Sequence, residues 1–510
     1  MTEAAPRYDA IVIGGGVGGL VAAAHLAAGG FARSRLRVVL VEARNMLGGT
    51  AENLPFGDGF RGPVGGHAIY ALDPASIGKL RLARRGLAFA ERDMALVALR
   101  QGGRHIVLTR DVYACRATIA AHDTGDADRF PRFRREAFAL ARHMRSFWDG
   151  TAGAAADERP VLDRLARLSA AAWLDGWFAS DALKAALAFD ATSCGFSPLE
   201  PGSALALIWR WGLEACGLQG GSAQVAGGPG ALAAALAKAA QASGVAIRTG
   251  AHVEAILYEG GRVVGVRLST GEMLAAGVVL SSLDTRRTLL HLLPPEALPF
   301  GAAAALGARE GARAPASASV LLALNRPPAF AAGLSARALR GRFVFPERPD
   351  AIAEAKGAAL TGLMPAELVV EATLPSEADP AHGPISQHVL SALIRFLPAQ
   401  PAGGWASHRT ALKDRLIAAL EVFAPGLAQS VVGFEVLTPD DLAARYGDMS
   451  SQAADALGRL LAAPETRVRS VVPGLYFCGG AAEPATALSG RAARLAAALA
   501  RADAKAEARA

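Results

Sequence analysis

The clearest fold signal of the chain lies in YDAIVIGGGVGG at residues 8–19 and RLRVVLVEARNMLGGT at residues 35–50. The apolar runs predict buried parallel strands over Tyr8–Ile13 and Arg35–Ala43. The Ala- and Leu-rich segment between them predicts a helix over Gly18–Ala28. A strand, a helix and a second strand within about 35 residues form the unit that opens a Rossmann-type domain.

The glycines between the first strand and the helix match the pattern GxGxxG. Gly14 permits the tight turn, Gly16 lets the backbone approach a pyrophosphate, and Gly19 lets helix and strand pack closely. The helix N-terminus, with Val17 and Gly18, then presents free N–H groups to the phosphates. We therefore expect these five residues to contact a dinucleotide.

An acidic residue closes the second predicted strand. Glu42 stands roughly 20 residues after the glycines, where a carboxylate binds ribose hydroxyls. This position favours FAD or NAD over NADP. The pattern E-x-R-x-x-x-G-G-T that follows resembles flavoproteins of the phytoene desaturase and amine oxidase superfamily, and it favours FAD over NAD. Its expected cofactor contacts are Glu42, Ala43, Arg44, Gly48, Gly49 and Thr50.

The resemblance extends along most of the chain to the phytoene dehydrogenase-related family, and more narrowly to a branch named after a pyridine nucleotide-disulfide oxidoreductase domain. It implies an FAD-dependent enzyme in which Val253 makes backbone contacts to the adenine. The four cysteines include no CxxC pair, so we expect no disulfide chemistry. The landmarks of the resemblance are Pro201-Gly202-Ser203, GGPGAL at 227–232, Gly250 and Val253, with further matches at 388–398, 423–426 and 437–442.

The C-terminal segment LYFCGGAAEPATALSG, residues 475–490, departs from the family's pattern. Family members usually carry His-Pro and three glycines here, against the flavin ring. In this chain Glu483 replaces the histidine and Ala485-Thr486-Ala487 replace the glycines. Alanine is costly wherever the glycine had a positive φ, so we expect a loop of different shape or one farther from the flavin. The cofactor contacts implied for this segment are Gly479, Gly480, Glu483, Leu488 and Ser489.

Candidate catalytic side chains are few, because a flavin performs the hard chemistry itself. His67, in Gly65-Gly66-His67, is a candidate base or covalent attachment point, with a structural histidine as the alternative. Glu483 is a candidate general base or a hydrogen-bond partner of the flavin ribityl chain, and we favour the second role. Asp190 and Arg210 receive no specific role. Because His, Asp and Glu do not cluster at ligand spacing, we expect no metal.

Rossmann-like signals recur near residues 225–290 and at the end of the chain, whereas residues 110–220 show helical periodicity. We therefore predict an α/β fold in which a discontinuous Rossmann-type FAD-binding domain carries an inserted α+β substrate domain. The predicted FAD-binding domain comprises residues 1–100, 222–300 and 465–510, and the predicted substrate domain comprises residues 101–221 and 301–464.

The composition bounds the partners. The chain of 510 residues is 52% hydrophobic and carries a net charge of +7, spread over many arginines. No basic stripe with interleaved aromatics is present, so we expect no nucleic-acid partner. Few cysteines and the lack of a signal peptide predict a cytoplasmic protein, while the charge leaves peripheral contact with an anionic membrane open. Oligomeric state is not predicted.

These features leave several functions open. The chain has no second GxGxxG, so electrons are expected to come from a substrate C–H bond and leave to oxygen, a quinone or a protein. The first hypothesis is a dehydrogenase or desaturase that transfers hydride from an apolar or amphipathic small molecule to flavin N5. The alternatives are a flavin amine oxidase, a redox-neutral isomerase and a flavin-binding partner protein without catalysis.

Overall fold

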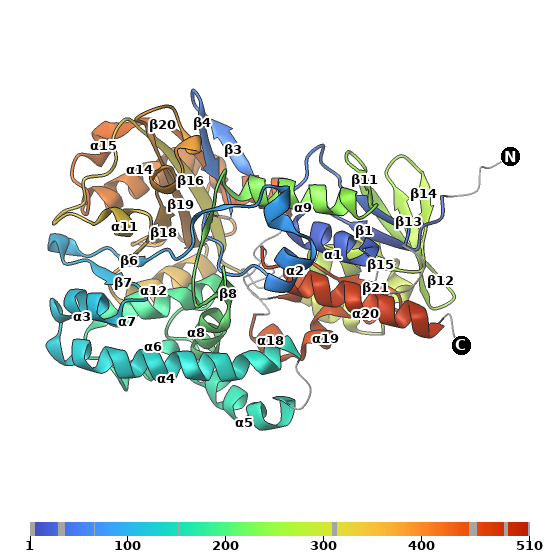
Figure 1. Cartoon of the computed structure of the whole chain (residues 1–510), viewed down its shortest axis with the longest axis horizontal. Helices are drawn as coiled ribbons and strands as arrows, with labels where there is room; N and C mark the ends of the chain where they lie inside the picture. The colour runs from blue at the N-terminus through green and yellow to red at the C-terminus, as the bar shows by residue number, and fades with distance from the viewer. Residues whose placement is uncertain are drawn as a thin grey trace.

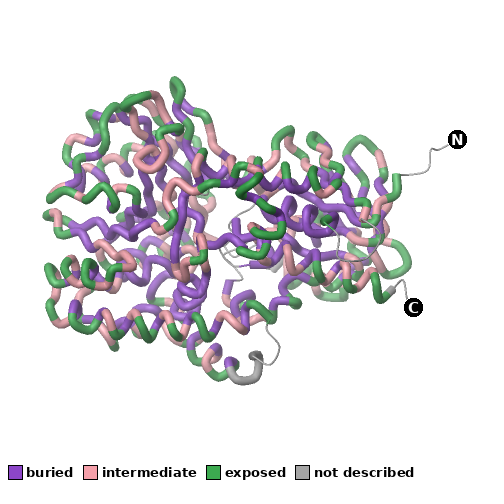
Figure 2. The backbone as a smooth tube through the Cα atoms, in the orientation of Figure 1, coloured by how far each residue is buried: buried purple, intermediate pink, exposed green. Residues whose placement is uncertain are grey.

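The computed structural model describes residues 6–28, 36–65, 67–150, 154–308, 314–447, 456–483 and 488–507. Two lobes lie side by side (Figure 1), and each is built around its own large sheet. The first strand and the last helix of the chain lie in the same lobe. The backbone of both sheets is largely buried (Figure 2), so each lobe has its own apolar core.

The first lobe contains a sheet of five parallel strands. Its strands come from three separated parts of the chain, which confirms the predicted discontinuous Rossmann-type fold. Both strands expected before residue 45 form, although each is shorter than predicted. The spatial order is β11 (Ala246–Arg248), β2 (Val38–Val41), β1 (Ala10–Ile13), β15 (Val279–Ser281) and β21 (Leu475–Phe477).

Helix α1 (Val17–Ala27) is buried along its whole length. It packs between α9 (Pro229–Ala242) and α20 (Arg491–Glu507). All three helices are rich in alanine, whose small side chain lets helices approach one another and the sheet closely. A meander of β12 (Val253–Glu259), β13 (Arg262–Leu268) and β14 (Met273–Ala275) completes this lobe, and Gly260-Gly261, a pair typical of turns, joins its first two strands.

The second lobe is built on a seven-stranded sheet in which the pairing is antiparallel except between β17 and β6. The sequence stretches at 316–326 and 367–375 have the composition of strands, and each forms a strand of this sheet. Residues 96–98 pair in this sheet, although the predicted domain division groups them with the first lobe. The order is β20 (Val431–Leu437), β16 (Ala316–Leu324), β19 (His388–Leu397), β18 (Val369–Thr373), β17 (Arg342–Phe345), β6 (Leu96–Ala98) and β7 (Ile106–Leu108).

Helices formed by residues between 112 and 212 lie along the lower side of this lobe in Figure 1. The helical periodicity of this part of the sequence predicts them. Their centre is aromatic: the Phe133 ring lies 4.9–5.9 Å from the rings of Trp173, Trp177, Phe178 and Trp211. The elements are α3 (Val112–Ala120), α4 (Thr124–Asp149), α5 (Ala154–Arg167), α6 (Ala170–Asp175), α7 (Asp181–Ala188), η3 (Phe189–Cys194) and α8 (Ser203–Gly212).

Two longer helices remain, α12 (Pro349–Leu360) and α14 (Gly404–Glu421). The amphipathic sequence at 409–425 predicts the second of them, and most of the other elements are short. These other elements include β3 (Asn53–Phe56), β4 (Phe60–Pro63), α2 (Pro74–Lys79), β5 (Phe89–Glu91), β8 (Glu214–Ala215), β9 (Leu218–Gln219), β10 (Gln224–Val225), α10 (Ala302–Ala308), α11 (Ala336–Leu339), α13 (Pro375–Ala378), α15 (Leu427–Ser430), α16 (Pro439–Tyr446), α18 (Ala456–Leu461) and α19 (Pro464–Val468).

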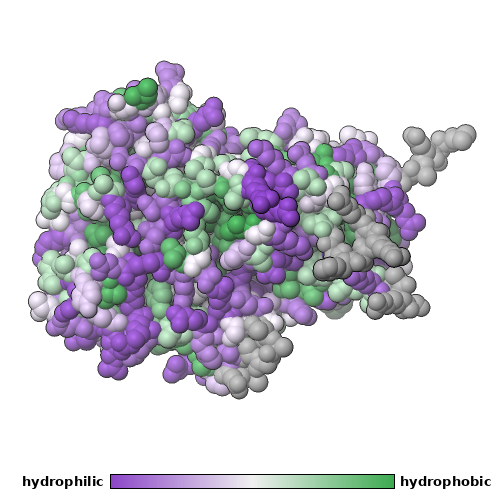
Figure 3. Space-filling model, in the orientation of Figure 1, coloured by the Kyte–Doolittle hydropathy of each residue, from purple (hydrophilic) through white to green (hydrophobic). Residues whose placement is uncertain are grey.

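The face of the molecule in Figure 3 is mostly hydrophilic, with apolar side chains gathered near the middle, where the lobes meet. Among the described helices, none combines the length and the apolar character that a bilayer crossing requires.

Candidate functional site

The glycines of the first turn have different surroundings. Gly14 has a φ of +92°, which a residue with a Cβ rarely adopts. A Cβ on Gly19 would lie 1.9 Å from the carbonyl oxygen of Gly14, and a Cβ on Gly18 would lie 2.2 Å from that of Cys478. The start of α1 is therefore pressed against both β1 and the segment after β21.

Gly16 has more room than these two glycines. A Cβ built on it would have the Cα of Gly49 at 3.9 Å and the oxygen of Gly48 at 4.0 Å as its nearest neighbours. Gly16 is also the N-cap of α1, and among the described residues no side chain caps this helix start. The first N–H groups of α1, together with the backbone of Gly16, Gly48 and Gly49, which carries no side chains, are suited to bind a pyrophosphate.

Glu42 stands at the end of β2 beside this turn. Its Oε2 accepts a hydrogen bond from the Gly15 N–H at 2.6 Å, and its Oε1 accepts one from the Arg44 N–H at 2.8 Å. The Glu42 carbonyl accepts from the Ala251 N–H at 2.8 Å, two residues before Val253 begins β12. Glu42, predicted to bind the ribose, and Val253, predicted to contact the adenine, thus lie on adjacent segments, as the binding of a dinucleotide requires.

Arg44 extends from this region toward the second lobe. Its Nη2 donates to Glu52 Oε2 at 2.9 Å, and its guanidinium lies 5.4 Å from the ring centre of Tyr446. The Tyr446 hydroxyl donates to the same carboxylate oxygen at 2.9 Å. Burial and the Glu52 carboxylate both raise the pKa of Tyr446, so this phenol stays protonated. Arg44, which the sequence places at the cofactor, is in this way tied to α16.

The segment after β21 lies beside the glycine turn at the start of α1. A Cβ on Gly479 would lie 2.2 Å from the Ser282 carbonyl oxygen, and Gly480 opens a short 3-10 helix that ends at Ala482. The Ser489 hydroxyl donates to a carboxylate oxygen of Glu483, and both residues are buried. Residues 485–487, where the family pattern is altered, lie outside the described residues. Burial raises the pKa of the Cys478 thiol, so Cys478 is not a thiolate nucleophile.

A cavity of about 440 Å³ lies between this segment and the seven-stranded sheet. Predicted site residues Thr50, His67, Leu488 and Ser489 line it from the first lobe's side. Most other lining groups are apolar or small, and Arg395 and Asp440 are the charged ones among the described residues. The remaining wall comprises Val64, Gly65, Ala68–Ala71, Thr192–Gly195, Pro315–Ser317, Leu393, Phe396, Ala399, Gln400, Pro439, Leu442, Ala443 and Tyr446.

A buried carboxylate stands behind His67. Glu371, on β18, is 1% exposed and lies 3.4 Å from His67 Nε2. Its Oε1 also accepts a hydrogen bond from the Tyr70 hydroxyl, and its Oε2 accepts one from Arg395 Nη2 at 3.0 Å. Burial alone would raise the pKa of Glu371, but Arg342, His67 and Arg395 hold it well below its usual range. Glu371 is therefore ionised and fixes the His67 ring.

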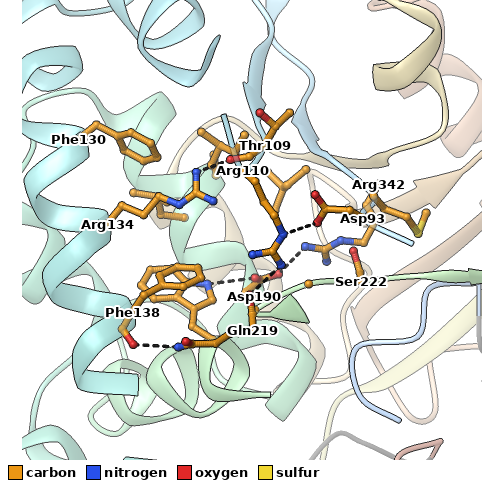
Figure 4. Close-up of a pocket in the computed structure, with 18 of the residues that line it drawn as sticks. Asp93, Thr109, Arg110, Phe130, Arg134, Phe138, Asp190, Gln219, Ser222 and Arg342 are labelled. Carbon is orange, nitrogen blue, oxygen red and sulfur yellow. Dashed lines mark hydrogen bonds and ion pairs between the residues drawn. The ribbon is translucent and has the colours of Figure 1, made fainter. Parts of the chain in front are cut away.

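Arg342 links this carboxylate to a second one. Its Nη1 lies 3.4 Å from Glu371 Oε1, and its Nη2 lies 3.0 Å from Asp190 Oδ1. Asp190 also accepts a hydrogen bond from the Trp211 indole at 3.2 Å. Figure 4 shows Asp190 and Arg342 in the wall of a smaller cavity of about 100 Å³, beside the Arg110–Asp93 ion pair. Asp190 and Arg342 line this smaller cavity, whereas Arg395 lines the larger one.

Several residues of this buried cluster carry charges that the sequence interpretation did not assign. Sequence patterns assign no specific role to Asp190 and Arg210, and they do not single out Glu371, Arg342 or Arg395. One signal was available: Glu371 interrupts the apolar run VVEAT, and Arg395 interrupts the apolar run SALIRFL. A charge in the centre of a buried strand requires a partner, and such partners gather at functional sites.

Known proteins resemble the chain over most of its length. Residues 17–402 match the family described as flavin containing amine oxidoreductase. The chain is 30% identical to the rat protein named pyridine nucleotide-disulfide oxidoreductase domain-containing protein 2, over 96% of this chain and 93% of that one. It is 29% identical to hydroxyneurosporene desaturase of Cereibacter sphaeroides, over 96% of this chain and 97% of that one.

Solved structures share the fold at lower identity. An oxidoreductase from Methanosarcina mazei superposes with a TM-score of 0.62 at 17% identity, covering 97% of this chain and 100% of the other. A putrescine oxidase superposes with a TM-score of 0.61 at 16% identity, covering 98% and 99%. At these identities the likeness concerns the fold alone.

Proposed function

This chain belongs to the family of flavin-containing amine oxidoreductases and binds FAD, and we propose that it is a dehydrogenase or desaturase of an amphipathic small molecule. FAD supplies the acceptor for a hydride, at its N5 atom. The first lobe offers what the nucleotide half of FAD needs: the Gly16, Gly48 and Gly49 backbone for the pyrophosphate and Glu42 for the ribose. The single observation that carries the proposal is the 440 Å³ cavity beside this site.

The walls of the cavity support an amphipathic substrate. Aliphatic side chains such as Val64, Leu393 and Leu442 form a large part of the wall and suit an apolar body. Polar groups occupy only part of the wall, with His67 and Arg395 on the side of the buried cluster. A purely polar substrate would leave the aliphatic wall in contact with water or polar groups, which is unfavourable.

We assign the proton of the reaction to His67. Desaturation removes a hydride and a proton from adjacent carbons, and His67 is the cavity side chain suited to take up the proton. Its Nε2 faces Glu371, which leaves Nδ1 as the nitrogen for a substrate proton. The ionised Glu371 stabilises the imidazolium that results. Arg342 and Arg395 hold Glu371 in place, so they are positioning residues for this step.

The amine oxidase alternative receives less support from the cavity. An amine substrate is held by aromatic faces near the flavin, through cation–π attraction. The cavity contains the rings of Tyr70, Phe396 and Tyr446. However, guanidinium groups already lie 4.2 and 5.0 Å from the Tyr70 ring centre and 5.4 Å from that of Tyr446. The positive charge of an amine substrate would be repelled by the arginines that already lie beside these two rings.

Anaerobic reduction of the bound flavin tests the proposal. The holoprotein is mixed without oxygen with three panels: unsaturated apolar hydrocarbons, amphipathic acids and alcohols, and simple amines. We expect an amphipathic compound to bleach the flavin. Its product should contain two hydrogen atoms fewer than the substrate, because a hydride and a proton have left it. Bleaching by simple amines alone, with peroxide formed on readmission of air, would establish the amine oxidase alternative instead. No bleaching by any panel would favour a flavin-binding protein without catalysis.

A further inference from the structure

The buried cluster behind the cavity contains more positive than negative charge. Three guanidiniums, those of Arg210, Arg342 and Arg395, share two carboxylates, those of Asp190 and Glu371. Arg210 Nε lies 4.0 Å from Asp190 and the other three pairs are at 3.0–3.4 Å. His67 and Tyr70 add no negative charge, because burial and Glu371 raise the pKa of the Tyr70 phenol. Each guanidinium has a carboxylate neighbour, but among the described residues the cluster carries one more positive than negative charge.

Arg395 is the member of this cluster that the cavity reaches. Its side chain is 12% exposed, against 4% for Arg342 and 1% for Arg210. Arg395 lines the 440 Å³ cavity, whereas Arg342 lies on the smaller one. Its Nη2 bonds to Glu371, and its buried Nε has no hydrogen-bond partner among the described residues. The buried Nε atoms of Arg342 and Arg210 likewise have no hydrogen-bond partner among the described residues, so what distinguishes Arg395 is that its side chain borders the cavity.

The backbone at this position is built to aim side chains into the cavity. Leu393 and Arg395 lie on one face of β19, and an ordinary strand would turn Phe396 to the other face. Instead, the register between β19 and β16 shifts at this point, between the pairs Ile394–Ala318 and Leu397–Ala316. Phe396 has a φ of +56°, and it lines the cavity together with Arg395. Bulges that re-aim side chains in this way are frequent beside active sites.

The other formal charge of the cavity lies at its open side. Asp440 is exposed to solvent, and its Oδ1 already accepts a hydrogen bond from Gln400 Nε2 at 3.1 Å. Among the described residues it forms no ion pair with Arg395. The interior of the cavity is positive and largely apolar, which suits a molecule with an apolar chain and an anionic head.

We propose that the cavity binds apolar-chain carboxylic acids, with the carboxylate paired to Arg395. This inference rests on the proposed function, whose substrate class it narrows. A guanidinium presents two parallel donors that match the two oxygens of a carboxylate. The carboxylate supplies the missing negative charge of the cluster, and the aliphatic wall with Phe396 receives the chain.

Calorimetric titration of the holoprotein with decanoate, decanol and decylamine tests the inference without turnover. We expect decanoate to bind at least about tenfold more tightly than decanol, because a charged hydrogen bond is lost with the alcohol. Decylamine is expected to bind more weakly still. Equal affinities for decanoate and decanol, or no binding of decanoate, would overturn the inference even if no variant folds.

Variants then identify the residue. Arg395→Gln is expected to weaken decanoate binding about tenfold or more and to leave decanol binding unchanged, while Arg395→Lys retains part of the preference. Arg267→Gln, at an exposed ion pair with Glu254 on the other lobe, serves as the matched control and is expected to keep the wild-type preference. An unchanged preference in Arg395→Gln would assign the carboxylate to another group and overturn the inference. The titration measures binding and not turnover. Tight decanoate binding without reduction of the flavin by any compound would therefore refute the proposed function and leave the carboxylate site standing.

Discussion

Gly18 and Cys478 lie so close together that a Cβ on Gly18 would come within 2.2 Å of the Cys478 carbonyl oxygen. The two residues are 460 positions apart in the numbering, one at the start of α1 and one just after β21. Their contact joins the first and last pieces of the FAD-binding fold. The segment that follows Cys478 is thereby fixed beside the pyrophosphate turn and the cavity.

Gly18→Ala is expected to separate these two segments. Its Cβ would meet backbone rather than a flexible side chain, so we expect a loss of about 1–3 kcal/mol in the free energy of unfolding and a lower FAD content. Gly357→Ala, at an exposed helical site with no atom within 4 Å, is the matched control and should be neutral or slightly stabilising. Urea unfolding and the flavin-to-protein absorbance ratio measure both effects. A wild-type FAD content in Gly18→Ala would argue against this contact.

Glu42→Gln is expected to weaken FAD binding about ten- to a hundredfold. The variant loses the charge that the ribose hydroxyls are predicted to meet, and hydrogen bonds to charged groups contribute about 1.5–3 kcal/mol. Fluorescence titration of the apoprotein with FAD measures the change. Glu254→Gln removes an exposed carboxylate of the same lobe and should leave the affinity as it is. Equal FAD affinities in the two variants would show that the Glu42 carboxylate does not contribute to FAD binding.

Glu371→Gln is expected to destabilise the second lobe by about 3–5 kcal/mol. The amide cannot neutralise Arg395, which loses its ion-pair partner in a mostly buried place, and Arg342 is left with Asp190 as its one carboxylate among the described residues. Glu136→Gln, which breaks an exposed pair with Arg132, should change stability by less than about 1 kcal/mol. Denaturant unfolding gives both values. A loss as small as that of Glu136→Gln would show that the cluster does not depend on Glu371.

The sequence predicted the fold far better than this cluster, for a physical reason. The elements β1, α1 and β2 follow from apolar runs and glycines that are neighbours in the chain, so local patterns suffice. Glu371, Arg342 and Asp190 meet only because η3, β17 and β18 come together in the folded lobe. Nothing local in the sequence encodes that meeting, nor the bulge that turns Phe396 into the cavity.

His25 is expected to make stability depend on pH. Burial, with Lys79 and Arg494 nearby, lowers the pKa of this histidine from 6.5 to about 4. The folded protein keeps His25 neutral while the unfolded chain takes up a proton, so this contribution to stability is present above pH 6.5 and is lost as the pH falls toward 4. The loss over this range is about 3 kcal/mol.

The unfolding free energy of wild type and of His25→Gln, measured across this pH range, checks the effect. The variant should show a shallower decline, and part of the slope should remain because burial also lowers the pKa of His105 and His382. Identical slopes in the two proteins would mean that His25 is already protonated in the folded state.

If substrate is oxidised in the 440 Å³ cavity, filling that cavity stops the reaction. Ala316 lies in its wall at the start of β16, and Ala316→Phe places a ring there. The measurement is anaerobic flavin bleaching by the compound that reduces wild type, with Ala117→Phe at an exposed position of α3 as the control. We predict that Ala316→Phe keeps its FAD and loses bleaching, while Ala117→Phe keeps both. Bleaching at the wild-type rate by a folded, FAD-loaded Ala316→Phe would contradict the claim.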